Sequence, residues 1–362
     1  MNPEYDEDSR RFRHPDAPLE EFGGDTMAEP EQKPEKPSKR RRLPKPPRRG
    51  RRILIRFIRF LIFISLIAVA AYGFYLFNII SKVSTNALQL GPLSADASGR
   101  TNILVLGKGD PGHDGENLTD TMMILSLDGP GHRMAQISIP RDLRVNIPGY
   151  GYGKVNSANA YGGVELAEKT VTNTFDIPID YYVETNFSGL KEVVDAVGGL
   201  DVDVKERLTD SEYPCDDNQY EVCGLDIKPA LQHMDGATVL KYVRCRKGTC
   251  GNDFGRAARQ QEVIGLLRPK ITDWHVVLNP IKLKSLVTAI QKGVQTDMGM
   301  IQLLLLGNAV NQAGDNNPVH LVLSNGPDGY LRSDPNGSSD LLPIGGNFDD
   351  ISEKIKSIFS SN

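Results

Sequence analysis

The chain has 362 residues, of which 39% are hydrophobic and 24% are charged, and its formal net charge is −4. This length allows one large domain with appendages or two modest domains, and the apolar content suits a globular core. The net charge excludes little, because the charges are segregated into a basic block over residues 39–52 and an acid-rich stretch from Asp201 to Asp226. The segments of the chain therefore differ in character.

Residues 1–50 are poor in aliphatic side chains, rich in Pro, Glu, Asp, Lys and Arg, and without apolar periodicity. Such a segment cannot bury enough surface to offset its chain entropy, so we predict a disordered, basic cytoplasmic tail over residues 1–52. A basic tract is also typical of nucleic-acid binding. Because an apolar segment follows directly, we assign the tract to membrane topology and expect no nucleic acid as a partner. A DNA-binding regulator is the weakest alternative.

Residues 53–80 are predicted to form one transmembrane helix. The run from Phe60 to Phe77 has no charge, and with its flanks it can cross a hydrocarbon core of about 30 Å. The basic block upstream predicts a cytoplasmic N-terminus and an extracytoplasmic C-terminal part. A cleaved signal peptide is disfavoured, because the apolar run is long and no clear cleavage site follows. We therefore expect a single-pass signal-anchor in the cell membrane.

Beyond a stalk over residues 81–100, predicted strands and helices alternate. Strands are predicted over residues 102–106, 121–127, 133–139, 180–184, 200–204, 239–246 and 319–323. Helices are predicted over residues 165–175, 188–197, 256–268, 283–290, 300–310 and 348–359. This alternation predicts an α/β domain with a mixed central sheet flanked by helices. We assign residues 101–270 to this domain and residues 271–362 to a C-terminal extension of it.

The four cysteines all lie in the predicted extracytoplasmic part. An even number of thiols in an oxidising compartment predicts two disulfides, and local pairing joins Cys215 to Cys223 and Cys245 to Cys250. A zinc site is the alternative, but these spacings fit the paired CxxC pattern poorly.

Two aspartates stand at the ends of a Gly-rich loop between the first two predicted strands. Asp110 lies in the loop after the first strand, and Asp120 begins the second. Loops at strand ends are where α/β sheets place ligands, and two carboxylates suit Mg²⁺ together with phosphate oxygens and water. The alternative is that both are ordinary turn-forming or solvated residues.

Arginines are concentrated after the third predicted strand and around residue 250. Arg141 and Arg144 follow the third strand, near the edge that carries the two aspartates. In the predicted strand 239–246, Arg244 and Arg246 project from one face, and an anion between them would relieve their repulsion. The predicted helix that follows carries Arg256, Arg259 and Gln260 in its first turns, after Asp253, where backbone N–H groups also favour anions. A phosphate or pyrophosphate site is therefore favoured over exposed surface charge.

The same residues carry a resemblance to a known family. The segments NILVLGKGD, TDTMMILSLD, QISIPRDLRV, KVNSANAYGG, VVDAVGGLDVDV and DFGRAARQQ, with the YVRCRKG segment before the last, occur in the order found in the LytR-CpsA-Psr (LCP) family. The match covers roughly residues 100–268. The resemblance implies an anchored α/β catalytic domain with an apolar tunnel for a polyprenyl chain. It also implies transfer of a polymer from polyprenyl pyrophosphate to peptidoglycan.

The resemblance assigns roles to individual residues. Asp110 and Asp120 match the family's magnesium-associated aspartates. Arg141, Arg244, Arg246, Arg256 and Gln260 match its pyrophosphate-binding or catalytic positions, and Asp253 matches an acidic one. At two places the sequence departs from the family pattern: Leu118 stands where an arginine is frequent, and Lys108 with Gly109 follows Gly107 in the first motif. Lys108 could supply the missing cation.

These observations predict a phosphotransferase that is assisted by Mg²⁺ and uses a polyprenyl-pyrophosphate-linked glycan as donor. The arginines would hold the pyrophosphate, with Arg144 and Arg259 assisting, and Asp142 or Asp253 could act as the general base. A polyprenyl-pyrophosphate hydrolase is the alternative enzyme. A non-catalytic module that binds or senses lipid-linked glycans is the alternative from another class.

Overall fold

The computed structural model describes residues 48–81, 86, 91–112, 114–130, 132–215, 220–271, 273, 285–286, 288–290, 293–313 and 318–359. The predicted tail over residues 1–52 therefore lies largely outside the described residues. Of the predicted helix over residues 283–290, residues 285–286 and 288–290 are described, and they are helical.

A long helix, α1 (Arg48–Ile80), contains the predicted membrane span. Within it the segment Ile53–Tyr75 has a mean hydropathy of 2.5, and none of that segment is buried. By length and composition this is the one helix among the described residues that could cross a membrane. From Phe60 to Phe77 no charged side chain interrupts it, as is typical of a segment that is apolar on all sides.

The domain is built on a mixed, six-stranded sheet with the strand order β11-β6-β1-β2-β3-β12. Its strands are β1 (Arg100–Lys108), β2 (Thr119–Asp128), β3 (Arg133–Ile139), β6 (Tyr181–Asn186), β11 (Val294–Thr296) and β12 (Val319–Val322). β1 runs antiparallel to β2 and parallel to β6, and β3 runs antiparallel to β2 and parallel to β12. The predicted α/β class with a mixed central sheet is confirmed.

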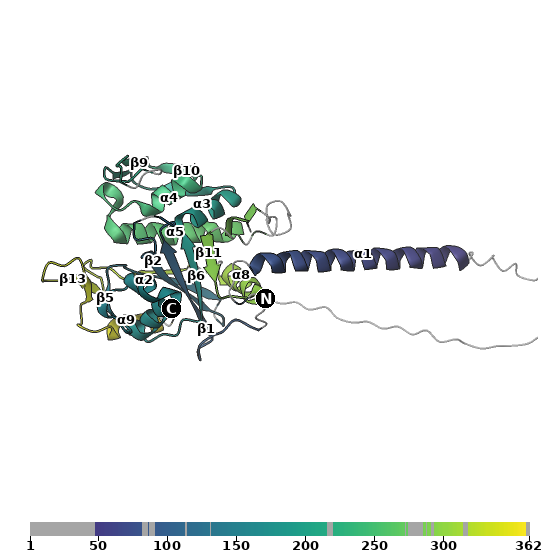
Figure 1. Cartoon of the computed structure of the whole chain (residues 1–362), viewed down its shortest axis with the longest axis horizontal. Coiled ribbons are helices and arrows are strands. Elements are labelled where there is room, and N and C mark those ends of the chain that lie inside the picture. Colours follow the sequence, from purple (N-terminus) through teal and green to yellow (C-terminus); the bar gives the residue numbers. More distant parts are fainter. Residues whose placement is uncertain are drawn as a thin grey trace, which may run out of the picture. The chain divides into compact units, whose positions relative to one another are not determined.

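The sheet is covered on both faces, as Figure 1 shows. The alternation of side chains along β1 explains this: Leu104 and Leu106 pack in one core cluster with Phe175, whereas Ile103 packs in another with Leu303. One face carries α2 (Ser157–Phe175), α9 (Asp349–Lys356), and the strands β4 (Arg144–Ile147), β5 (Gly151–Lys154), β13 (Leu331–Ser333) and β14 (Leu341–Pro343). The other face carries α5 (Asn252–Ile271) and α8 (Met300–Ala313).

A further layer lies over α5 (Figure 1). It consists of α3 (Phe187–Ala196), α4 (Gly236–Arg244), the one-turn helix η1 (Gly248–Cys250), and the strands β7 (Leu200–Val204), β8 (Leu208–Asp210), β9 (Leu225–Ile227) and β10 (Ala230–Met234). Its core forms from the inward side chains of β7 and β10 with those of the three helices. Close contact of α3 with α4 requires Gly236, because a Cβ there would lie 2.1 Å from the Lys191 carbonyl oxygen.

The prediction of a strand over residues 239–246 is wrong, because this segment is helix α4 followed by an irregular connection. Its valines and tyrosine favour a strand by propensity, but their burial follows helical spacing: Val239, Tyr242 and Val243 are buried, at i, i+3 and i+4. The missed signal is Asp235, whose side chain accepts a hydrogen bond from Thr238 N and so caps the helix.

The C-terminal third of the chain completes the sheet and the core. β11 pairs with β6, and β12 pairs with β3, at opposite edges of the sheet. Residues before β1 also pack on the domain, since Ser94 N donates to the Tyr181 hydroxyl at 2.9 Å. At the start of β1 the Arg100 guanidinium donates to the carbonyls of Ile355 and Lys356, near the end of α9.

Candidate active site

A cavity of about 620 Å³ lies between the sheet and the helices α3, α4 and α5. One part of its wall is apolar. That part is formed by Val105, Val183 and Val294 from the strands, and by Leu190, Val193, Leu240, Val243, Val263, Ile264 and Leu267 from the helices. The other part, here called the mouth, is polar and is formed mainly by Asp120, Arg141, Arg244, Arg246, Lys247, Arg256 and Gln260. The cavity therefore suits a ligand with an apolar chain and an anionic head.

Helix α5 contributes to both parts of this wall through one face. Arg256, Gln260, Val263, Ile264 and Leu267 all line the cavity, and their spacing of three and four residues aligns them along the helix. The face changes from charged at the N-terminal end to aliphatic toward the C-terminal end. One helix thus sets the direction in which a ligand would lie.

A buried glutamine fixes α5 above the sheet. The side-chain nitrogen of Gln261 lies within hydrogen-bonding distance of Ser138 Oγ (2.9 Å), the Gln136 carbonyl (3.1 Å) and the Leu321 carbonyl (3.2 Å). Gln261 is only 3% exposed, so these bonds form in a dry environment where they favour a single arrangement. They hold the helix across β3 and β12.

Arg141 and Arg256 form an ion-paired network with three aspartates at the mouth. Arg141 Nη1 lies 2.7 Å from Asp120 Oδ1, and Arg141 Nε lies 3.5 Å from Asp142 and 3.7 Å from Asp253. Arg256, which is 7% exposed, lies 3.1 Å from Asp253 and donates to the Asp120 carbonyl at 3.3 Å. The network holds both guanidinia beside the cavity.

Burial and neighbouring charges act in opposite directions on these two arginines. For Arg141 burial lowers the pKa, but the hydrogen bond to Asp120 and the nearby carboxylates outweigh it and raise the pKa overall. For Arg256 burial dominates and lowers the pKa, against the charges of Asp253 and Asp120 and together with repulsion from Arg141 and Arg246. An anion at the mouth would therefore relieve the unfavourable burial of the Arg256 charge.

Arg244 and Arg246 both line the cavity, although not for the predicted reason. Arg244 is the last residue of α4 and lies over the Phe187 ring at 4.2 Å, whereas Arg246 lies in the connection that follows. Among the described residues, neither guanidinium forms an ion pair with a carboxylate. Two guanidinium groups without a paired carboxylate beside one cavity are the kind of groups to which a phosphate would bind.

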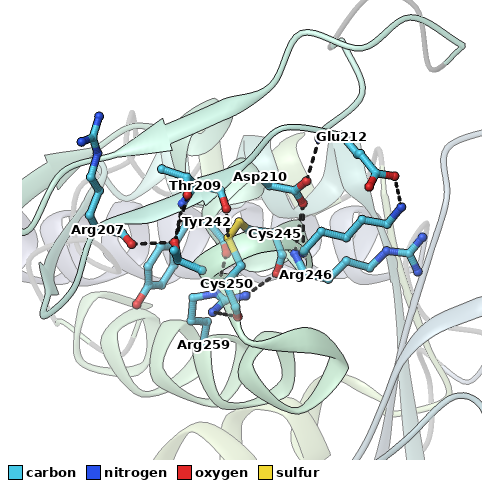
Figure 2. The surroundings of a disulfide bond; sticks show 11 residues. Arg207, Thr209, Asp210, Glu212, Tyr242, Cys245, Arg246, Cys250 and Arg259 are labelled. Atoms are coloured by element: carbon cyan, nitrogen blue, oxygen red, sulfur yellow. Dashed lines mark hydrogen bonds and ion pairs between the residues drawn. A yellow bond between two sulfur atoms is a disulfide. The ribbon is translucent and has the colours of Figure 1, made fainter.

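The connection that carries Arg246 is held by a disulfide (Figure 2). Both predicted disulfides, Cys215–Cys223 and Cys245–Cys250, are present. The second closes the connection between α4 and α5, and the buried Asp210 carboxylate accepts from the backbone nitrogens of Arg246 and Lys247 at 3.4 and 3.1 Å. The start of α5 approaches this loop so closely that a Cβ at Gly255 would lie 2.5 Å from the Cys250 carbonyl oxygen.

The Arg259 side chain does not line the cavity. It lies beneath this loop, whereas the prediction placed it at the pyrophosphate. Its guanidinium donates to the carbonyls of Tyr242, Cys245 and Cys250, as Figure 2 shows for the cysteines, and the side chain is 8% exposed. Burial lowers the pKa of Arg259, against the attraction of Tyr242. The residue satisfies the carbonyls at the end of α4 and so positions Arg246.

Arg144 is also separate from the mouth. Its exposed side chain lies 3.4 Å from Asp340 and 6.0 Å from the centre of the Tyr152 ring, on the hairpin of β4 and β5. Gln260 does line the cavity, and its side-chain nitrogen lies 3.5 Å from the Val243 carbonyl.

Of the two predicted magnesium ligands, Asp120 lines the cavity and Asp110 does not. Asp120 lines the mouth, with one carboxylate oxygen bound to Arg141. Both oxygens of Asp110 accept hydrogen bonds from Ser188, one from its nitrogen and one from its hydroxyl, each at 2.9 Å. Within the part of the chain that the structure describes, no three His, Cys, Asp or Glu side chains gather as metal ligands. Asp120 fits a magnesium ion that takes its other ligands from phosphate and water, and Asp110 as arranged does not.

The structure also places Lys108 and Leu118, the residues at which the sequence departs from the family pattern. Lys108 is paired with the buried Glu184 of β6, so its charge is already neutralised at the edge of the cavity. Leu118 lines the cavity and is 36% exposed, as an apolar residue where an arginine was expected.

Several lining residues were not anticipated from the sequence. Lys247 adds a cation, paired with Glu212, while Phe187 and Tyr213 place their rings beside Arg244. The aliphatic lining was missed because isolated valines and leucines in helices and strands are indistinguishable from core residues. The pattern that could have revealed it is the aliphatic face of α5, which continues directly from Arg256 and Gln260.

The chain thus combines an α/β domain with one cavity that is apolar in one part and rich in arginine at its mouth. The sequence model of the LytR_cpsA_psr family matches residues 78–332, and the chain belongs to this family.

Three relatives illustrate the similarity. The chain is 33% identical over 203 residues to the polyisoprenyl-teichoic acid–peptidoglycan teichoic acid transferase TagU of Bacillus mycoides, covering 56% of this chain and 62% of that protein. It is 36% identical over 204 residues to the probable cell wall biosynthesis protein LcpB of Corynebacterium glutamicum, covering 56% and 46%. The crystal structure of Bacillus subtilis TagV aligns with a TM-score of 0.56 and 26% identity, over 73% of this chain and 99% of that one. The chain thus spans less than two thirds of the length of these curated relatives.

Proposed function

We propose that this protein transfers a glycopolymer from a polyprenyl-pyrophosphate carrier to a hydroxyl group of peptidoglycan. The observation that carries the proposal is a cavity whose wall changes from aliphatic to cationic along helix α5. Membership of the family and the transferase name of the TagU relative support it. The carrier's apolar chain would lie against the valines and leucines, and its pyrophosphate against the arginines.

The proposed location follows from α1 and the basic residues before it. The span Ile53–Tyr75 would anchor the chain in the cell membrane with its N-terminus in the cytoplasm. The domain would then face the cell wall, where both the lipid-linked donor and the peptidoglycan acceptor are accessible. The disulfides suit an oxidising, extracytoplasmic compartment.

The binding of the pyrophosphate would rest on four arginines. Arg244 and Arg246 bring charges that no described carboxylate neutralises, and Arg141 and Arg256 are held in place by the aspartates of the mouth. One guanidinium group can donate two parallel hydrogen bonds to two oxygens of a phosphate, and these bonds are stronger in a site with little water. The anion would thus be fixed in position before an acceptor arrives.

The proposed reaction is a phosphoryl transfer. The acceptor hydroxyl oxygen forms a bond to the phosphorus that carries the glycan, and the bond from that phosphorus to the bridging oxygen breaks. Polyprenyl phosphate leaves with the bridging oxygen, and the hydroxyl proton passes to a base or to solvent. The protein contributes mainly position and electrostatic stabilisation of the charge on the transferring group.

The predicted general bases, Asp142 and Asp253, are each engaged with two cations. Asp142 lies against Lys154 and Arg141, and Asp253 lies against Arg256 and Arg141. Such pairing favours a positioning role for both carboxylates over proton transfer. We also propose Asp120 as the protein ligand of Mg²⁺, which when bound would neutralise charge on the pyrophosphate. For Asp110 a ligand role would require its release from Ser188.

The test uses the full chain in lipid vesicles with Mg²⁺, a polyprenyl-pyrophosphate-linked glycan and purified peptidoglycan. We expect glycan phosphate attached to the peptidoglycan, and none with Arg244→Ala. Release of free glycan phosphate without attachment would favour the hydrolase instead. Donor binding without any turnover would favour the non-catalytic binding module and contradict the proposal.

A further inference from the structure

The hairpin of β4 and β5 presents a polar and aromatic face away from the core. Val145 and Ile147 are buried against the main core cluster, so the alternating residues Arg144 and Asn146 point outward. The antiparallel register pairs Asn146 with Tyr152 and Arg144 with Lys154, which places these four side chains on the same outward face. We call these four residues the hairpin face.

The centre of the hairpin face is an aromatic ring that is held open to solvent. Tyr152 is 75% exposed, and the Arg144 guanidinium lies 6.0 Å from its ring centre. Arg144 is itself held by Asp340, and Lys154 donates to Ser339 Oγ at 2.7 Å. A flat exposed ring surrounded by amide, carboxylate, hydroxyl and guanidinium groups is the composition that suits a sugar chain. Pyranose rings stack their C–H faces on aromatic rings, and their hydroxyls bond to the polar groups around.

The hairpin face is connected to the proposed transfer site by a chain of ion pairs. Lys154 Nζ lies 2.6 Å from one oxygen of Asp142, whose other oxygen lies 3.5 Å from Arg141 Nε. Arg141 in turn lies 2.7 Å from Asp120 at the mouth. The adjacent residues Arg141 and Asp142 therefore connect the mouth to the hairpin, and a polymer bound on the hairpin face would lie near the mouth.

We propose that the hairpin face is the docking surface for the glycan chain of the acceptor. Tyr152 stacks on a sugar ring, Asn146 bonds to sugar hydroxyls or acetamido groups, and Arg144 binds a carboxylate of the wall polymer. This inference rests on the proposed function, because it names where the acceptor of that same site binds. It also gives a role to Arg144, which the mouth does not use.

The first measurement is retention of the full chain, in lipid nanodiscs, on peptidoglycan sacculi that have been stripped of attached polymers. Tyr152→Ala should weaken retention roughly three- to tenfold, the effect of losing one aromatic stacking contact. Tyr152→Phe keeps the ring and should stay within about twofold of the wild type. Leu231→Ala, which removes a side chain that is 71% exposed on β10, should leave retention unchanged.

The second measurement separates acceptor docking from donor chemistry. With soluble peptidoglycan fragments, Tyr152→Ala and Arg144→Ala should raise the KM for the acceptor and leave the donor KM and kcat unchanged. Normal transfer with retention insensitive to both variants would overturn the docking surface and leave the proposed function standing. Retention that follows Tyr152, in a protein that transfers no glycan, would support the docking surface and contradict the transfer.

A photoreactive residue identifies the occupant directly. With p-benzoylphenylalanine in place of Tyr152, illumination in the presence of sacculi should cross-link the full chain to glycan that lysozyme-type digestion releases. Cross-linking to a second copy of the chain, or to lipid, would assign the surface to another occupant and overturn the proposal.

Discussion

At the mouth of the cavity, charged side chains are held by ion pairs and hydrogen bonds, whereas the aliphatic side chains of its apolar part are held by packing. Arg256 and Leu267 lie on the same face of α5, yet the first is fixed by Asp253 and the second by packing in a hydrophobic cluster. Ion pairs and hydrogen bonds fix the side chains at the mouth. The apolar part favours an apolar ligand, because a polar group there would lack a hydrogen-bond partner. A change at the mouth should therefore affect the reaction, and a change in the interior should affect recognition of the lipid.

The largest effect is expected from Arg256→Ala. This variant removes a pyrophosphate ligand, leaves the Asp120 carbonyl without its Arg256 donor and leaves Asp253 with Arg141 alone, so transfer should fall roughly a hundred- to a thousandfold. Arg256→Lys keeps the charge but not the planar fork and should be intermediate. Lys270→Ala, which changes a loosely paired residue on the same helix, is the matched control. Near-normal transfer in Arg256→Ala, measured with labelled donor, would remove Arg256 from the site.

A smaller and different effect is expected from Ile264→Trp, which narrows the apolar part of the cavity. The donor KM should rise about tenfold for a long polyprenyl chain and change little for a short one, because only the long chain reaches the filled space. Ile264→Leu conserves volume and serves as the control. Equal losses with both donors would indicate that the aliphatic wall does not bind the lipid.

A smaller effect on the donor KM is expected from loss of the Cys245–Cys250 disulfide, which closes the connection that carries Arg246 and Lys247. Replacing both cysteines by serine should lower the free energy of unfolding by about 2 kcal/mol and raise the donor KM a few-fold, because Arg246 and Lys247 lose their fixed position. The same replacement at Cys215 and Cys223 should lower stability by a similar amount with less effect on the donor KM. Chemical denaturation and donor titration measure the two quantities separately, and identical KM effects would contradict a positioning role.

The smallest effect concerns Glu168 on α2, outside both parts of the cavity. Burial, then the charges of Asp297 and Glu165, raise its pKa from 4.5 to about 7. Between these values the folded protein binds more protons than the unfolded chain, so stability falls as pH rises through this window and levels off above about pH 7. Because the side chain is partly exposed, solvent screening limits the loss to about 1 kcal/mol. Glu168→Gln should flatten this dependence in thermal unfolding between pH 4.5 and 8 and leave transfer unchanged; an unaltered profile would assign the dependence to other groups.

Much of the fold could be predicted from the sequence, because the strands of the central sheet are short apolar runs with clear turn residues between them. β3 and β7 have the predicted bounds, and β1 and β2 extend the predicted strands by a few residues. Helix α4 could not be predicted from propensity, since valine, leucine and tyrosine fit either state and only tertiary packing decides. The prediction that Arg244 and Arg246 share one face of a strand was therefore wrong in its reason, because Arg244 ends a helix and Arg246 follows it.

The charged residues of the candidate site could be predicted from the sequence, but the contacts that hold them could not. Arginines and aspartates are conspicuous in sequence, so Arg141, Asp120 and Arg256 were identified. Their partners lie far along the chain, and for that reason neither the carbonyl contacts of Arg259 nor the hold of Ser188 on Asp110 could be predicted. Which arginines bind an anion and which support the fold depends on these distant contacts.

In the proposed function, the two ends of one cavity bind the two ends of one ligand. It is tested most directly by measuring the binding of polyprenyl pyrophosphate and of inorganic pyrophosphate to the full chain in nanodiscs, for the wild type, Arg256→Ala and Ile264→Trp. We expect Arg256→Ala to weaken the binding of both ligands, and Ile264→Trp to weaken the binding of the polyprenyl ligand alone. Equal weakening of both ligands by Ile264→Trp, or no preference of the wild type for the polyprenyl ligand, would contradict it.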